Sequence, residues 1–212
     1  MQAGVSNTLK EIKHYTSGNR HIVEPVYASN SYNVRWTFEP GKPVKLDYSY
    51  QQKDDVEFAG ITFDYPEEKV MGMKWLGNGP YRVWKNRLKG GTLGVWHKDY
   101  NNTVTGESWN YPEFKGYHSN LKWVVVENKQ SPFTIYTEND HVFLQMLTPQ
   151  APAGANNTNT SPAFPKGNIG FMNAISMIGT KFKPAVDMGP QSQKNMALNS
   201  TPVTGTLWFD FQ

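Results

Sequence analysis

The sequence predicts an all-β protein, an antiparallel sandwich with few or no helices, and three observations carry this prediction. Short runs rich in β-branched and aromatic residues alternate with clusters of turn-forming residues along most of the chain. Aromatic residues make up 14% of the 212 residues, which suits strands. Helical periodicity is nearly absent and no repeat period stands out, so two packed sheets are the natural architecture.

The first twenty residues leave the type of element open. Leu9, Ile12 and either Tyr15 or His14 could line one face of a short helix behind a Ser6 cap. The run is short and polar, and a strand is an equally good interpretation.

From Ile22 onward the strand signal is clear. In the first half of the chain we expect strands at Ile22–Tyr27, Tyr32–Phe38, Val44–Tyr50, Val56–Phe63 and Val70–Leu76. The run Val44–Tyr50 alternates strictly, which is typical of a half-buried antiparallel strand. One face carries Val44, Leu46, Tyr48 and Tyr50, and the other carries Lys45, Asp47 and Ser49.

In the second half we expect strands at Leu121–Glu127, Phe133–Thr137, His141–Leu147 and Val203–Phe211, and Ile169–Ile178 is an apolar run. Two long polar stretches, 97–120 and 148–168, read as loops, and a loop of such length is often functional. The second could pass for a linker between domains. Because only 44 residues follow it, too few for a second core, we expect residues 1–212 to form a single β-sandwich domain.

Composition excludes several classes of function. The chain has no cysteine, so disulfides, thiolate metal sites and cysteine nucleophiles are excluded. Its net charge of +3 is too small to argue for nucleic acid as a partner. No apolar run reaches the roughly 18 residues of a membrane span, and the amino terminus does not look like a signal peptide. We therefore expect neither a nucleic acid nor a membrane partner, and no cofactor is predicted.

The segment Trp75–Trp96 concentrates the unusual chemistry of the chain. Its Gly77–Pro80 stretch partly imitates a phosphate-binding glycine loop, but Arg82 stands where a third glycine belongs and Pro80 lacks an amide donor. A rigid turn that aims the residues after it is the better interpretation.

A cluster of basic and aromatic residues follows this stretch. In an extended chain, Arg82, Trp84 and Asn86 would share one side, with Arg87 on the other. An indole beside guanidinium and amide groups can stack on a sugar and bind its hydroxyls. The alternative is a core tryptophan, with the aliphatic parts of nearby lysine and arginine side chains lying on apolar surface and their charged ends in solvent. The same residues could stack on nucleic acid bases, but acidic segments flank the cluster.

Among the remaining titratable residues, Glu113 and His118 are the candidates. Glu113 lies in an aromatic loop and could accept hydrogen bonds from Arg82, from Arg87 or from a ligand. The five histidines show no metal-ligand spacing, so no metal site is predicted.

Several motifs, in this order, together resemble the carboxy-terminal domain of family 2 glycoside hydrolases, the β-galactosidase type. They are FDYPEEKV, WLGNGPYRVWKNRLKG, LGVW, YPEFKGY and MGPQSQ. The resemblance covers most of residues 40–212 and implies a galactose-mutarotase-like β-supersandwich. In that family the domain packs beside a TIM barrel and contributes loops to the rim of the sugar site. It also implies carbohydrate and the remaining enzyme domains as partners, and a periplasmic or extracellular bacterial location.

The catalytic glutamates of that family lie on the barrel, one of them after an asparagine. This sequence has no Asn-Glu dipeptide and no alternating βα pattern. The resemblance therefore implies a non-catalytic chain, a carboxy-terminal piece of a larger hydrolase. A tryptophan that β-galactosidases place against the substrate has no counterpart in 167–195, so a preference for galactose does not carry over.

Three functions remain open on this basis. The leading one is an accessory domain that completes a sugar site, with Arg82, Trp84, Asn86, Arg87, Glu113 and His118 as candidate sugar-binding residues. The second is an independent carbohydrate-binding module. The third is a mutarotase-like epimerase, for which His118 and Glu113 are the nearby acid–base pair.

Overall fold

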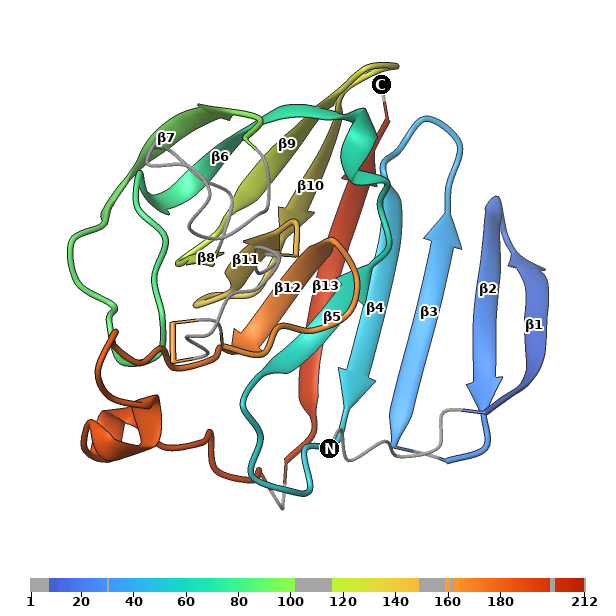
Figure 1. The fold of residues 1–212 in the computed structure, drawn as a ribbon. Coiled ribbons are helices and arrows are strands. Elements are labelled where there is room, and N and C mark those ends of the chain that lie inside the picture. The colour runs from blue at the N-terminus through green and yellow to red at the C-terminus, as the bar shows by residue number, and fades with distance from the viewer. Residues whose placement is uncertain are drawn as a thin grey trace.

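Two antiparallel sheets make up the fold (Figure 1). The computed structural model describes residues 8–29, 31–101, 116–148, 159–160, 162–198 and 201–211. Within them, a nine-stranded sheet has the order β1-β2-β3-β4-β13-β10-β9-β6-β7, and a four-stranded sheet has the order β5-β12-β11-β8. The described helical turns are all short 3-10 turns, so the prediction of an antiparallel all-β fold is confirmed.

The strands of the large sheet are β1 (Leu9–Ser17), β2 (Arg20–Tyr27), β3 (Tyr32–Phe38), β4 (Val44–Tyr50), β6 (Val70–Gly79), β7 (Thr92–Asp99), β9 (Trp123–Asn128), β10 (Phe133–Thr137) and β13 (Val203–Asp210). Those of the small sheet are β5 (Ala59–Phe63), β8 (Tyr117–His118), β11 (Phe143–Met146) and β12 (Ile169–Ala174). The 3-10 turns are η1 (Glu67–Lys69), η2 (Ala185–Asp187) and η3 (Pro190–Ser192). No helix in the described ranges is long and apolar enough to cross a membrane.

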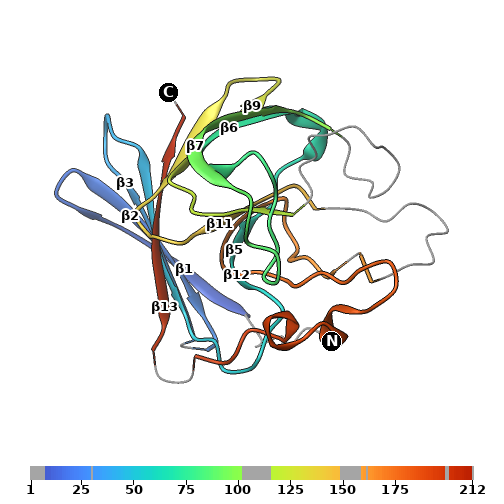
Figure 2. The same ribbon diagram turned by 90° about the vertical axis from the view of Figure 1, so that its left-hand side faces the viewer.

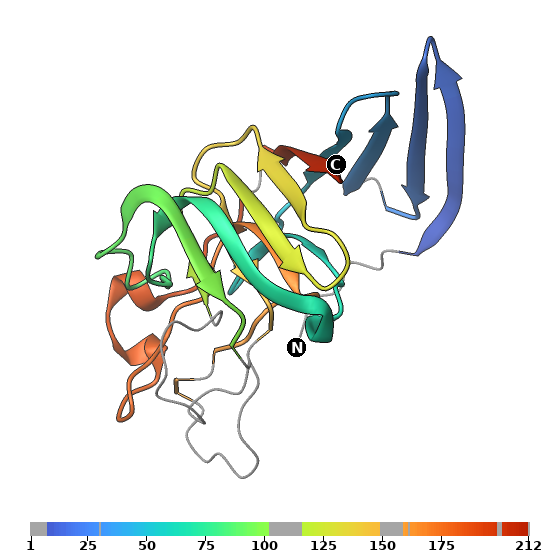
Figure 3. The same cartoon turned by 90° about the horizontal axis from the view of Figure 1, so that it is seen from above.

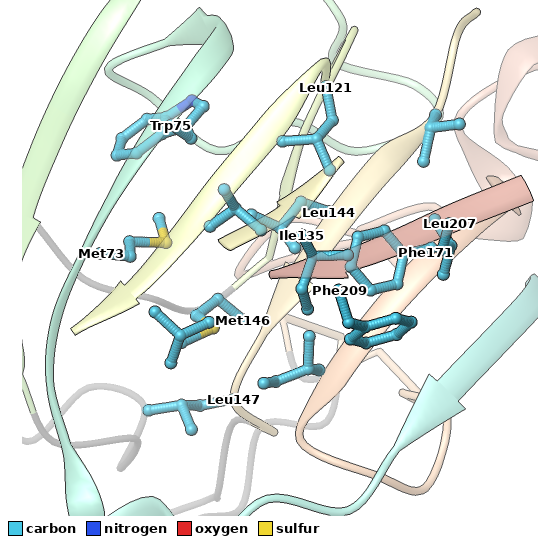
Figure 4. Packing of buried hydrophobic residues seen from close by; sticks show 14 of the residues in the cluster. Met73, Trp75, Leu121, Ile135, Leu144, Met146, Leu147, Phe171, Leu207 and Phe209 are labelled. Atoms are coloured by element: carbon cyan, nitrogen blue, oxygen red, sulfur yellow. The ribbon is translucent and has the colours of Figure 1, made fainter. Parts of the chain in front are cut away.

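The large sheet curves around the small one, and the main core fills the space between them (Figures 2 and 4). Fully buried side chains from both sheets meet there, among them Trp75, Leu144 and Phe171. The predicted alternation of Val44–Tyr50 is confirmed, since Leu46 and Tyr48 are the residues of β4 that are buried in this core.

The small sheet has a second apolar cluster that includes residues of its other face. Met172 of β12 and Tyr117 of β8 pack there against Val83 and Trp84, which precede β7, and against Ile175. Each strand of a sheet presents alternate side chains to opposite faces, so β12 contributes Phe171 to the main core and Met172 to this cluster. The molecule is therefore layered as large sheet, small sheet and irregular cover.

Several elements differ from what the sequence indicated, and one of them is β7, which no expected strand covers and which ends inside the expected loop 97–120. The first segment, left open between helix and strand, is the strand β1. The strand expected at Val56–Phe63 begins only at Ala59, and Val56 instead forms an isolated bridge with Asn195. The apolar run Ile169–Ile178 is a strand only as far as Ala174. Within the expected loop 97–120, Tyr117 and His118 form the strand β8.

The turn predicted at Gly77–Pro80 is wrong, because Gly77 to Gly79 continue β6. These glycines leave space for a neighbouring side chain, and they do not reverse the direction of the chain. A Cβ on Gly79 would lie 2.6 Å from the indole of Trp96, whose Nε1 donates to the carbonyl of Gly77 at 3.2 Å. The strand accepts a tryptophan lying across its backbone, which only glycine permits at this distance.

Candidate functional site

The chain reverses at Lys85 and Asn86, and the basic aromatic cluster is built around this reversal. Trp84 and Arg87 bridge each other, with the N–H of Trp84 donating to the carbonyl of Arg87 at 3.2 Å and the reverse bond at 2.8 Å. The N–H of Val83 donates to the carbonyl of Tyr117 at 2.6 Å. We call residues 83–87 the clamp hairpin; its backbone is fixed to the edge of the small sheet at β8.

Trp84 lies in the second apolar cluster rather than on the surface. It is 7% exposed, and its ring meets those of Tyr117 and Phe164 edge to face at centroid distances of 5.8 and 5.4 Å. Val83 is also buried, so the predicted two-sided alternation does not hold through this segment. The geometry is that of the alternative interpretation, a core tryptophan with polar neighbours around it.

The tip of the clamp hairpin is bound to a later irregular segment, residues 176–194. The backbone N–H of Lys85 donates to the carbonyl of Ser176 at 2.9 Å. Its ammonium donates to the carbonyls of Gln193 and Lys194 at 2.7 and 2.8 Å. Burial lowers the pKa of Lys85, and the charge of Asp55 opposes that effect. This lysine thus joins two parts of the segment that are distant in sequence.

The amide of Asn86 makes three hydrogen bonds to the same segment. Its Nδ2 donates to the carbonyl of Ile178 at 2.9 Å and to Oγ of Ser192 at 2.8 Å, and its Oδ1 accepts from the N–H of Ile178 at 3.0 Å. Arg87 adds a bond from Nη2 to the carbonyl of Gly179 at 3.0 Å. Both side chains were predicted to bind sugar hydroxyls, and in the structure these polar groups bond to backbone and to a serine.

The fastened segment, residues 176–194, turns apolar side chains outward. It contains η2 and η3 and lies below β7 in Figure 1, where it is drawn in orange and red. Phe182 is 84% exposed, with the ammonium of Lys181 5.8 Å from its ring centre, and Val186 is also exposed. Phe171, which precedes the segment on β12, lies in the main core instead.

His118 lies beneath the clamp hairpin's attachment to the small sheet. It is fully buried, its ring centre is 4.5 Å from that of Trp75, and neither ring nitrogen has a hydrogen-bond partner. Burial, and then the charges of Lys98 and Arg82, hold the pKa of the His118 imidazole well below its usual value. This histidine is neutral at physiological pH.

Arg82 is half-buried and packs against Gly116, where a Cβ would come within 3.0 Å of its side chain. Glu113, the remaining candidate, lies outside the described residues. The pairing of His118 with Glu113, on which an epimerase would depend, lies outside them as well. In the described ranges no group of three metal-ligating residues occurs.

A polar groove on the outer face of the large sheet was not expected from the sequence as a site. It has a volume of about 750 Å³ and is lined from β1 to β4, from β13 and from residues 138–139. Arg35 donates to Glu24 at 2.5 Å inside it, and Asp47 accepts from Thr206 at 2.7 Å. The polar face of Val44–Tyr50 was the available signal, because Asp47 and Ser49 line the groove.

These features define an antiparallel β-sandwich whose smaller sheet is covered by a fastened irregular segment. A family model described as "Beta galactosidase small chain" matches residues 2–167, well over half of the chain. The chain therefore belongs to the β-galactosidase small chain family, and the predicted relationship to β-galactosidases is confirmed. No curated protein matches the chain. The fastened segment lies beyond the matched residues.

Replacing Asn86 by alanine tests the clamp hairpin. The change leaves the N–H and carbonyl of Ile178 without their partner, which costs about 1–3 kcal/mol where such groups stay buried. We expect faster amide hydrogen exchange in residues 176–194, with the amides of β9 unchanged. Lys89→Ala, which removes an exposed cation just beyond the hairpin, is the matched control. Equal exchange in both variants would show that the segment is held by other contacts.

The buried histidine predicts a pH dependence of stability. The native state holds His118 neutral, whereas the unfolded chain takes up a proton near pH 6.5. The free energy of unfolding should therefore be flat above about pH 6.5 and fall below it, by at most about 1.4 kcal/mol per pH unit.

Urea unfolding between pH 5 and 7.5 measures this slope. His118→Phe should flatten it, while His21→Gln, at an exposed position of β2, should retain it. An unchanged slope in His118→Phe would assign the effect to other groups.

Proposed function

We propose that this chain is a non-catalytic accessory chain of a β-galactosidase-type glycoside hydrolase. It supplies a shaped segment to the rim of a sugar site and packs on a catalytic barrel carried elsewhere in the enzyme. The observation that supports this is the fastening of residues 176–194 by seven hydrogen bonds that they form with Lys85, Asn86 and Arg87. In a retaining glycosidase the acid and the nucleophile are two carboxylates, which here come from the barrel.

The exposed side chains of the fastened segment support a contact role. Irregular segments that carry function are commonly held by a rigid scaffold, and this one is tied to the small sheet through the clamp hairpin. Its outward residues include Phe182 and Val186, and Met196 lies just beyond it at 79% exposure. Apolar side chains gathered on a held loop mark a surface that meets another molecule or domain.

The candidate sugar-binding residues take different parts in this proposal. Asn86 and Arg87 position the fastened segment, and Trp84 supports the clamp hairpin from below. Arg82 and Glu113 are the proposed sugar-contacting residues, since a guanidinium and a carboxylate give strong hydrogen bonds to hydroxyl groups. The neutral ring of His118 keeps the layer beneath Arg82 free of further positive charge.

Kinetics with a separate catalytic chain test the proposal. The pure protein should not cleave nitrophenyl β-galactoside. Added to a β-galactosidase catalytic chain that lacks this domain, it should form a complex and raise kcat/KM about tenfold or more, because a completed site orients the substrate. Asn86→Ala should keep the complex and lower kcat/KM through KM, and Lys89→Ala should change neither. Turnover by the pure protein, or a failure to form the complex, would contradict the proposal.

A second candidate, an independent carbohydrate-binding module, is favoured by the polar groove. Its volume of about 750 Å³ falls within the range of ligand sites, and its charges are already paired, as Arg35 is with Glu24. A neutral ligand rich in hydroxyl groups suits such a surface better than an ion. Calorimetry with a panel of neutral oligosaccharides should then give saturable heat that Arg35→Ala abolishes, with Lys89→Ala as the control. An absence of heat across the panel removes this candidate.

A further inference from the structure

Strand β1 ends the nine-stranded sheet and stands away from the sandwich. Its partner in the described structure is β2, in continuous antiparallel register from Glu11↔Val26 to Ser17↔Arg20. All nine of its residues are exposed. Figure 3 shows the β1–β2 hairpin projecting beyond the two packed sheets. The second edge of β1 therefore lies at the rim of the sheet, away from the core.

An edge of this kind is a template for another strand, unless the sequence blocks it. Proteins commonly block edges with charged side chains, with proline, with very short strands or with bulges. Residues 11–17 contain neither proline nor glycine, and the bulge of β1 lies before them, between Leu9 and Glu11. Seven consecutive residues thus offer regular, accessible backbone groups. What remains to control pairing is the charge pattern of the side chains.

That pattern is complementary to itself. A two-fold axis perpendicular to the sheet keeps each face on its own side, so residues of the same face must lie opposite each other. If Ile12 lies opposite its own copy, Glu11 lies opposite Lys13 of the second chain, and Lys13 lies opposite Glu11. The two side chains share one face, since their charged groups are 3.8 Å apart within β1. Opposite charges directly across strands stabilise a pair.

Other registers on the same axis lose this match. Centring on Glu11 places two carboxylates opposite each other, and centring on Lys13 places two ammonium groups opposite each other. On the reverse face, the Ile12-centred register joins two side chains of Ile12, each 57% exposed in the single chain. Charge and apolar contact therefore select one register.

We propose that β1 is a self-association edge, through which two copies of this chain pair antiparallel about Ile12 and join their large sheets into one. The contact is isologous, so it closes as a dimer rather than growing into a fibre. Because each copy contributes a single strand, the interface is small and the dimer is expected to be weak. The clamp hairpin adjoins β8 and is distant from β1 in Figure 1, so the dimer leaves the fastened segment accessible. The inference does not depend on the proposed glycosidase role.

Sedimentation velocity over a concentration series up to about 0.5 mM measures the association. Lys13→Glu places carboxylates opposite each other, and Glu11→Lys places ammonium groups opposite each other; each should weaken dimerisation at least tenfold. The exchanged pair, Glu11→Lys with Lys13→Glu, restores complementarity and should restore dimerisation. Lys89→Glu makes the same change of charge as Lys13→Glu, but next to the clamp hairpin, and should leave dimerisation unchanged.

Circular dichroism establishes that each variant is folded, since all three positions are exposed in the single chain. A wild-type protein that stays monomeric at every concentration would overturn the proposal. So would an exchanged pair that stays monomeric although it folds. Equal association of all variants would place the contact on another surface and would equally overturn it.

Discussion

The small sheet is buried on both faces, and this constraint organises the rest of the structure. Strands β11 and β12 are buried along almost their whole lengths, so their two faces each require a cover. The large sheet covers one face and forms the main core with it. The other face receives no third sheet in the described structure. Val83, Trp84 and the irregular chain after β12 cover it instead.

An irregular cover creates a problem that a sheet does not have. Its backbone N–H and carbonyl groups have no ladder to satisfy them, and such groups are costly to leave unpaired near a core. The clamp hairpin solves this with side chains. The ammonium of Lys85 donates hydrogen bonds to two backbone carbonyls, and the amide of Asn86 bonds both the N–H and the carbonyl of Ile178. The clamp hairpin is polar and aromatic for this reason. Trp84 fills the second apolar cluster, and the polar residues after it hold residues 176–194 in place.

The sequence predicted those strands that have one buried and one exposed face, because their alternation is a local signal. Val44–Tyr50 is an example, with bounds that the structure reproduces. β1 could not be assigned, because a strand exposed on both faces has no alternation to show. The glycines before Pro80 were misread because the cause of their presence, the ring of Trp96, lies across the strand pair. His118 joined a strand only through its pairing with Leu144, which no local pattern reveals.

For the candidate site, the sequence located the right segment but not the partners of its side chains. Asn86 and Arg87 carry the donor groups that sugar recognition needs, and the same donors suit carbonyls of a cover segment ninety residues away. Only the fold decides between these uses. It directs the polar groups of the hairpin to the cover segment and leaves Phe182 at the surface of that segment. Contact with the proposed catalytic chain is therefore to be sought on the fastened segment, and the clamp hairpin determines the shape in which that segment is presented.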